Sequence, residues 1–283
     1  MSGNAPYVEP LRELAGEAYQ LSDRLCGSCR DLHGLWPYIR LSRAEARESR
    51  LQEELRDLFD RGFRRVLIAG SQDTGLLTLI VHVGAGHDVE ITVLDICKTP
   101  LELCRRLAKQ WLLSIATIRH DLFELSMEQR FDVVLVHGTL QFIAADRRLE
   151  VLKRLRRAIR PAGQLILLFN TSRPISTEMR QQTDDDYGNK VLAELKRLDV
   201  PLPDKEQVLR ERLNAHQRRR EAREGAFAEP RDVELLLDKA GFNLKSCTLI
   251  DVDVAAPMKT FIAKISKRRF MAIAEGRARE QTR

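Results

Sequence analysis

The sequence lacks the long apolar runs that a membrane-spanning helix requires. Such a helix takes about 20 consecutive apolar residues, and no stretch of the 283 residues approaches that length. The first ten residues, MSGNAPYVEP, also lack the basic-then-apolar order of a secretory signal. These two absences predict a cytoplasmic protein that has no membrane partner.

Cysteine is scarce, with 5 residues in the chain, and this odd number indicates reduced thiols rather than a disulfide framework. Cys26 and Cys29 form a C-x-x-C pair with His33 four residues further on, a spacing that places all three on one face of a helix. They would supply part of a zinc site, but no fourth ligand is evident. Helix packing is the favoured explanation and no metal site is predicted, although metal binding by Cys26 and Cys29 stays open.

Acidic residues are fewer than basic ones, 41 against 47, which gives a formal net charge of +6. This excess concerns solubility and nonspecific association more than one specific ligand. Arginines are concentrated between Arg210 and Arg223, where glutamates interleave them as on a solvated helix face. A nucleic-acid partner is therefore an alternative and not the leading hypothesis.

The sequence is rich in alternating strand and helix patterns. The first 63 residues are helical in period, and Gly34 and Pro37 interrupt them, which predicts at least two helices. Strand-like and helical runs then alternate from Arg64 to Asn170, and this alternation predicts parallel strands with right-handed crossovers. The strand-like runs are RRVLIAG, VEITVLD, SIATIRHD, FDVVLVHG and PAGQLILLFN.

After these runs the sequence is polar and helical in pattern. A last helix, EPRDVELLLDKAGF, follows and is expected to end at the glycine near its carboxyl terminus. Two final runs, NLKSCTLIDVDV and MKTFIAKIS, are expected to pair antiparallel. The predicted fold is α/β: a doubly wound, seven-stranded, mostly parallel sheet with a reversed final strand. Its predicted parts are an amino-terminal helical lid (1–63), a core (64–174 and 229–266), a helical insertion covering the acceptor site (175–228) and a basic tail (267–283).

Two strand ends suit a nucleotide-like ligand. VLIAGSQDTG places Gly70 and Gly75 between a strand and a helix, where backbone amides can approach a ligand, although an ordinary turn also uses glycine. Asp95 ends the next strand, where a carboxylate can accept hydrogen bonds from ribose hydroxyls; helix capping is the alternative. Thr99 is the expected N-cap of the following helix, with Pro100 in its first turn.

The order of these motifs resembles the class I, Rossmann-like S-adenosylmethionine-dependent methyltransferases. The resemblance covers Arg64 to Phe169 through VLIAGSQDTG, VLD, RHDLFE, FDVVLVHGTLQF and LRRAIRPAGQLILL, and the run MKTFIAKIS is similar to the reversed final strand of that family. It implies S-adenosyl-L-methionine as cofactor and S-adenosyl-L-homocysteine as product. Ile68 and Gln72 depart from the acidic residue and the glycine that the family often has in its first motif.

The resemblance also implies contacts for particular residues. Asp95 would hold the ribose hydroxyls, Asp121 the adenine, and Ile96 would pack on the adenine ring. The implied cofactor contacts at the strand ends are Gly70, Ser71, Gly75, Asp95, Ile96, Asp121, Leu122, His137 and Gly138.

Further candidates lie at a strand end and in the helical segments. His137 is the candidate general base, because neutral imidazole titrates near working pH; a structural hydrogen bond is the alternative. In HGLWPYIRL, an expected helix break at the lid, Arg40 would pair with the methionyl carboxylate, with Tyr38 beside it at the cofactor. Trp36 and Tyr187 are the candidate acceptor contacts, and packing is the alternative for Trp36.

The leading hypothesis is an enzyme that methylates an oxygen or nitrogen of a small-molecule metabolite, because the extra helices suggest an enclosed pocket. The alternatives are an RNA or protein methyltransferase that uses the basic insertion, and a noncatalytic partner with the methyltransferase fold. A nicotinamide dehydrogenase is disfavoured because G-x-G-x-x-G is missing. The acceptor, the methylated atom, the use of a base and the oligomeric state, including a homodimer, stay open.

Overall fold

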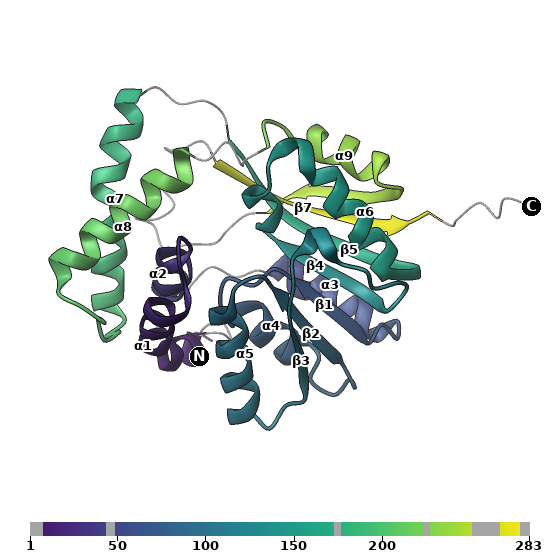
Figure 1. Ribbon diagram of the computed structural model, residues 1–283, viewed down its shortest axis with the longest axis horizontal. Coiled ribbons are helices and arrows are strands. Elements are labelled where there is room, and N and C mark those ends of the chain that lie inside the picture. Colours follow the sequence, from purple (N-terminus) through teal and green to yellow (C-terminus); the bar gives the residue numbers. More distant parts are fainter. Residues whose placement is uncertain (1–7, 44–48, 173–176, 223–226, 251–266, 278–283) are drawn as a thin grey trace, which may run out of the picture.

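The computed structural model describes residues 8–43, 49–172, 177–222, 227–250 and 267–277. Within these ranges an α/β sheet domain lies beside a group of helices (Figure 1). The predicted strand MKTFIAKIS, residues 258–266, lies outside the described residues. None of the described helices has the length and apolarity to cross a membrane.

One mixed sheet forms the centre of the fold. Its strands are β1 (Arg65–Ala69), β2 (Glu90–Asp95), β3 (Ile115–Arg119), β4 (Phe131–His137), β5 (Ile159–Ser172), β6 (Phe242–Leu249) and β7 (Lys267–Gly276). They lie in the order β3-β2-β1-β4-β5-β7-β6. The first five pair in parallel, whereas β7 is antiparallel to both β5 and β6. The predicted seven-stranded sheet with one reversed strand is confirmed.

Helices cover both faces of the sheet, so its central strands are buried on both sides and are continuously apolar. Val66 and Ile68 of β1 point into a core shared with four helices, and Leu67 and Ala69 point into a second core shared with two others. The first group is α1 (Val8–Leu25), α3 (Ser49–Asp60), α4 (Gly75–Val83) and α5 (Lys98–Gln110), and the second is α6 (Arg148–Ala158) and α9 (Pro230–Lys239). Three short 3-10 helices are η1 (Leu122–Glu124), η2 (Thr139–Phe142) and η3 (Ala145–Arg147).

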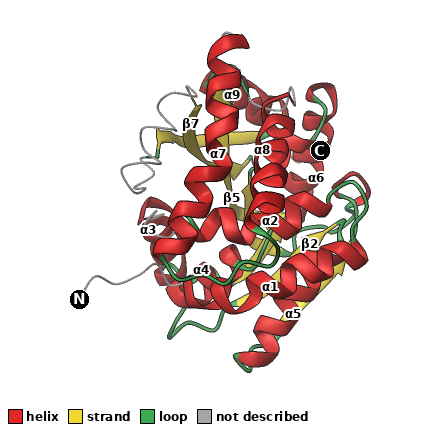
Figure 2. Ribbon diagram, turned by 90° about the vertical axis from the view of Figure 1, so that its left-hand side faces the viewer, coloured by secondary structure: helices red, strands yellow, loops and turns green. Residues whose placement is uncertain are grey.

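Four helices form a unit that we call the cap: α1 (Val8–Leu25), α2 (Arg30–Leu41), α7 (Thr177–Arg197) and α8 (Glu206–Ala222). Helix α1 also packs on the sheet domain through Leu14, Ala18 and Leu21. A third hydrophobic core holds the cap together and includes Leu11, Tyr38 and Tyr187. In Figure 2 these helices lie in front of the strands. The predicted lid and insertion are therefore one body, and α3, which was predicted as part of the lid, belongs to the core.

The predicted helix break at Gly34 and Pro37 is wrong, because both residues lie inside α2. A Cβ on Gly34 would stand 2.4 Å from Oγ of Ser22 in α1. Gly34 therefore permits close packing of two helices instead of ending one. The chain breaks earlier, between Leu25 and Arg30, where Gly27 lies.

The predicted basic tail is also wrong for residues 267–276, which form β7. Met271, Ala272 and Ala274 are buried, because β7 lies between β5 and β6. The basic residues at its start, Lys267 to Arg269, concealed a short apolar strand.

Candidate functional site

Strands β1 to β4 run in parallel, so their carboxyl ends meet at one edge of the sheet, which we call the carboxyl edge. In doubly wound sheets, ligands bind at this edge. Helix α2 of the cap contacts it at the turn after β1: Nδ1 of His33 lies 3.1 Å from the carbonyl oxygen of Gln72, and Arg40 pairs with Asp73. The cap therefore roofs the edge where the sequence places the cofactor.

Asp95 lies at the end of β2 and joins two turns of this edge. Its Oδ2 accepts a hydrogen bond from the backbone N–H of Ser71 at 2.7 Å, and its Oδ1 accepts one from that of Cys97, also at 2.7 Å. Burial raises the pKa of Asp95, although these backbone bonds oppose the rise. A carboxylate has about four acceptor positions, so each oxygen keeps the capacity to accept a further hydrogen bond.

Neighbouring side chains lie so close to the two glycines of the turn after β1 that a Cβ atom at either position would collide with them. Gly70 has a φ of +86°, and a Cβ there would lie 2.3 Å from Oγ1 of Thr139. A Cβ on Gly75 would lie 2.7 Å from the guanidinium of Arg40. The close approach expected at both glycines is thus made here by Thr139 and Arg40, and their contact with a cofactor stays a prediction.

Arg40 and Asp73 form a buried ion pair at this turn. Nε of Arg40 lies 2.8 Å from Oδ2 of Asp73, and the two side chains are 9% and 2% exposed. The other carboxylate oxygen of Asp73 accepts from the backbone N–H of Gly75 at 2.8 Å. Asp73 was not predicted from the sequence; its signal is an acidic residue in the turn between β1 and α4, opposite a buried arginine.

The other strand ends offer a less crowded surface. Ile96, beside Asp95, is 62% exposed, which is high for a large apolar side chain. Gly138, after β4, has a φ of +70° and no atom within 4 Å of the position that a Cβ would take. Asp121 accepts a hydrogen bond from the backbone N–H of Phe123 at 2.9 Å and so caps η1, and the next residue, Leu122, is buried.

The remaining candidates lie in different surroundings. Nε2 of His137 contacts the guanidinium of Arg269 in β7. Tyr38 and Tyr187 are buried inside the cap core, and Trp36 packs against it. The structure does not bring these three aromatic residues to the carboxyl edge beside Asp95, so their cofactor and acceptor contacts stay predictions.

Cys26 and Cys29 lie in the turn between α1 and α2, so the prediction that they share one helical face with His33 is wrong. The structure adds Cys97, which is the N-cap of α5 in place of the predicted Thr99. Burial would raise the pKa of Cys97, but the hydrogen bond to His33 and its positive charge outweigh this effect and lower the pKa to about 6. Cys97 was not predicted to join the other cysteines; the only sign of it in the sequence is its position two residues after Asp95, at the end of β2.

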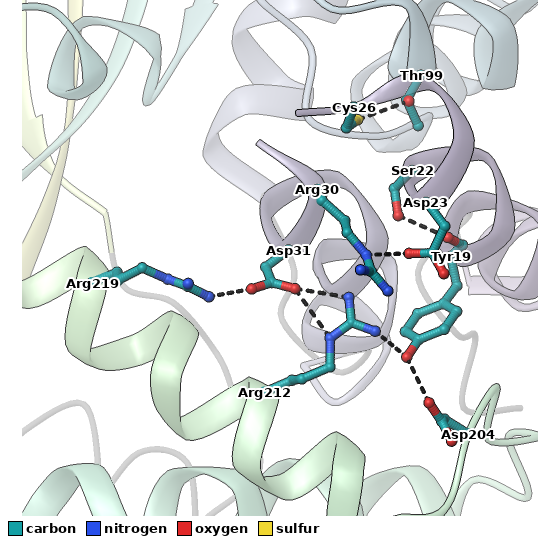
Figure 3. A network of polar contacts seen from close by, with 10 residues as sticks. All are labelled: Tyr19, Ser22, Asp23, Cys26, Arg30, Asp31, Thr99, Asp204, Arg212 and Arg219. Atoms are coloured by element: carbon teal, nitrogen blue, oxygen red, sulfur yellow. Dashed lines mark hydrogen bonds and ion pairs between the residues drawn. The ribbon is translucent and has the colours of Figure 1, made fainter. Parts of the chain in front are cut away.

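Arginines of the basic segment pair with acidic residues within the cap (Figure 3). Asp31 of α2 lies between Arg212 and Arg219 of α8, and the Arg212 contact measures 2.7 Å. Arg210 pairs with Glu206 on its own helix at 3.1 Å. Contacts with Arg212 and Arg219 lower the pKa of Asp31, although burial opposes the effect. Part of the basic segment therefore serves to join α8 to α2.

Comparison with known proteins finds similarities in sequence and in fold. A family model described as a methyltransferase domain matches residues 72–163. Carboxy-S-adenosyl-L-methionine synthase of Pseudomonas putida (strain GB-1) is 47% identical over 58 residues, which cover 20% of this chain and 23% of that protein. The match thus spans about a quarter of that curated relative.

Two solved structures share the fold. Geranyl diphosphate methyltransferase, in complex with S-adenosylmethionine, has a TM-score of 0.53 at 10% identity, covering 88% of this chain and 91% of that one. The [4+2]-cyclase SpnF has a TM-score of 0.55 at 12% identity, covering 92% and 96%. These likenesses show that the core, a seven-stranded sheet with one reversed strand, shares the fold of these proteins, and residues 72–163 within it match the methyltransferase-domain model.

Proposed function

We propose that the chain binds S-adenosylmethionine at the carboxyl edge and transfers its methyl group to an oxygen or nitrogen of a small-molecule acceptor. The observation that carries the proposal is Asp95, held at the end of β2 by two backbone N–H groups and flanked by the exposed Ile96. A carboxylate beside an apolar surface suits a ribose next to an adenine ring.

The residues at this edge fit the adenosine half of the cofactor. Asp95 would accept bonds from the ribose hydroxyls, Ile96 would cover one face of the adenine, and the space beside Gly138 would admit the ligand. S-adenosylmethionine, when bound, supplies a methyl group that its sulfonium has already activated. The task left to the protein is to align the acceptor and to keep water away.

The cap is the part of the chain suited to that second task. It lies over the carboxyl edge and is fixed there by the buried pair of Arg40 and Asp73. His137 would serve as base only if its Nε2 left Arg269, because that contact engages the nitrogen whose lone pair would take the proton. A base is optional in methyl transfer to an already nucleophilic atom, so the proposal does not depend on His137.

A small acceptor is favoured over RNA because arginines of the basic segment are already engaged. Arg212 and Arg219 pair with Asp31, and Arg210 pairs with Glu206, which reduces the charge offered to phosphates. The fold does not by itself determine the reaction, because it also occurs in a [4+2]-cyclase. A noncatalytic role is the second candidate, because Ile68 and Gln72 depart from the usual first motif.

Calorimetric titration tests the cofactor assignment. We expect wild type to bind S-adenosylmethionine and S-adenosylhomocysteine but not NAD, and Asp95→Ala to bind both about tenfold more weakly or worse, a loss of about 1.4 kcal/mol. Asp146→Asn, an exposed carboxylate in η3, is the matched control and should bind as wild type does. Equal binding by wild type and Asp95→Ala would remove the ribose assignment, and no binding by folded wild type would favour the noncatalytic role.

Transfer of a labelled methyl group tests the acceptor class. With S-adenosylmethionine labelled in its methyl group, we expect the label to appear in low-mass products when a mixture of small metabolites is supplied. Label in RNA or protein, lost steeply as salt rises, would instead support the nucleic-acid or protein acceptor.

A further inference from the structure

Three cysteine sulfur atoms converge where the cap meets the sheet. Sγ of Cys97 lies 3.4 Å from Sγ of Cys26 and 3.7 Å from that of Cys29, and all three lie within 4.8 Å of one another. Cys26 and Cys29 come from the turn between α1 and α2, whereas Cys97 follows β2, about 70 residues later. The fold therefore assembles a thiol cluster that the C-x-x-C spacing alone does not provide.

His33 lies beside this cluster. Its side chain is buried and interacts with Cys29 and Cys97, but its ring nitrogens are not among the ligand atoms that all lie within 4.8 Å of one another. Its Nδ1 lies 3.1 Å from the carbonyl oxygen of Gln72. In the neutral ring that a metal would bind, this contact keeps the proton on Nδ1 and leaves the lone pair on Nε2. A ring nitrogen bonded to a carbonyl group is the usual second contact of a histidine that binds a metal through its other nitrogen.

We propose that Cys26, Cys29 and Cys97 bind one zinc ion and that the neighbouring imidazole of His33 moves in as its fourth ligand. A tetrahedral site with Zn–S bonds of about 2.3 Å separates its sulfur atoms by about 3.8 Å, close to the 3.4 and 3.7 Å measured here. Three cysteines with one histidine, two of the cysteines in C-x-x-C, is a donor set of structural zinc. Four protein ligands leave no open position, so the ion holds structure and does not take part in methyl transfer.

Two of the three cysteines begin helices, Cys29 as the N-cap of α2 and Cys97 as the N-cap of α5, so the cluster lies where the cap and the sheet domain meet. Packing alone would require small buried residues but not a histidine among them. A disulfide would use two of the sulfurs and leave the third thiol and the imidazole without a role.

The proposed ion would join the cap to the cofactor edge. Two ligands come from the turn between α1 and α2, and the third, Cys97, lies two residues after Asp95. Loss of the ion should therefore loosen the cap before the sheet. The inference does not depend on the proposed function, because a noncatalytic protein would need the same attachment.

Metal analysis of the full chain, purified under reducing conditions, tests the site. Elemental mass spectrometry should find about one zinc per chain, and X-ray absorption at the zinc edge should show about three sulfur atoms at ~2.3 Å and one nitrogen at ~2.0–2.1 Å. Cys97→Ser should lose most of the zinc. Cys247→Ser, which alters a half-buried cysteine in β6, is the matched control and should keep it.

Each contrary result overturns the site. Wild type that takes up no zinc when the reduced protein is supplied with it, or a zinc edge with only oxygen and nitrogen neighbours, removes the proposal. A disulfide among Cys26, Cys29 and Cys97 in zinc-free reduced preparations does the same. If Cys97→Ser does not fold, the absorption spectrum of wild type decides alone, because it requires no variant.

Discussion

Arg40 and Asp73 join the cap to the sheet through a buried ion pair in which Nε lies 2.8 Å from Oδ2. The arginine comes from α2 and the aspartate from the turn between β1 and α4, so the pair crosses the boundary of two hydrophobic cores. Both side chains are almost fully buried, and burying a charge is costly unless its partner is present. The pair thereby fixes where α2 can lie.

Asp73→Ala should lower the free energy of unfolding by about 3–5 kcal/mol, because it leaves the Arg40 guanidinium buried without its carboxylate. Urea denaturation measures the change. Asp57→Ala is the control: it breaks a pair with Arg61 whose side chains are 60% and 51% exposed, and it should cost about 1 kcal/mol or less. Equal losses in the two variants would mean that the buried pair does not hold α2.

Gly70→Ala should destabilise the chain more than Gly138→Ala. Both glycines have positive φ, and a left-handed conformation costs an alanine about 1–2 kcal/mol. Only at Gly70 does the new Cβ also collide with Thr139, and overpacking adds about 1–3 kcal/mol. Thermal or urea unfolding measures the difference, and Thr139→Ala should recover part of it in the Gly70→Ala background but none in the Gly138→Ala background.

Asp31 should give the cap a stability that depends on pH. Its contacts with Arg212 and Arg219 hold its pKa below the ordinary 3.8, against the effect of burial. A carboxyl with a lowered pKa adds stability that is complete above its unfolded pKa and is lost as the pH falls through its folded pKa. Asp31→Asn should therefore cost about 1–2 kcal/mol at pH 6, and this difference should shrink below pH ~4.

Unfolding curves of wild type and Asp31→Asn between pH 3 and pH 7 measure this effect. Asp88→Asn, an exposed carboxylate between α4 and β2, serves as the control and should follow wild type throughout. A cost of Asp31→Asn that stays constant down to pH 3 would show that the carboxylate charge is not what holds α8 to α2.

Deleting residues 267–283 should yield an insoluble chain, because removal of β7 leaves the edges of β5 and β6 unpaired. Deletion of residues 278–283 leaves β7 whole and is the control. Solubility and size-exclusion profiles measure the outcome. A soluble, cooperatively unfolding chain without β7 would contradict the pairing of β7 with both neighbours.

The sheet was predictable because its signal is local. Each parallel strand is a short apolar run closed by a polar residue or glycine, and Asp95 follows such a run directly. The apolar run therefore locates the strand, and the polar residue or glycine that ends it locates the carboxyl edge. The same rules failed for β7, whose run from Phe270 to Ala274 is short and follows three basic residues.

Contacts between distant segments were not predictable in this way. Tyr38 was predicted as a ligand contact from an expected helix break, and Tyr187 from its place in the polar insertion. Only the assembled cap shows that they share one core. Cys97 was missed for the same reason, since nothing in C-x-x-C indicates which later residue returns to it. Asp73 and Arg40 can each be recognised in the sequence as charged residues. Their pairing cannot, because it depends on how α2 lies on the sheet.

Cys97 belongs to two sites at once: its backbone N–H holds Oδ1 of Asp95, while its sulfur lies among the other cysteines. If both proposals hold, cofactor and metal are coupled through this one residue. Coupling of two binding equilibria is reciprocal, so occupancy of either site changes the affinity of the other by the same factor. A zinc chelator would then act as an allosteric antagonist of the cofactor without entering its pocket.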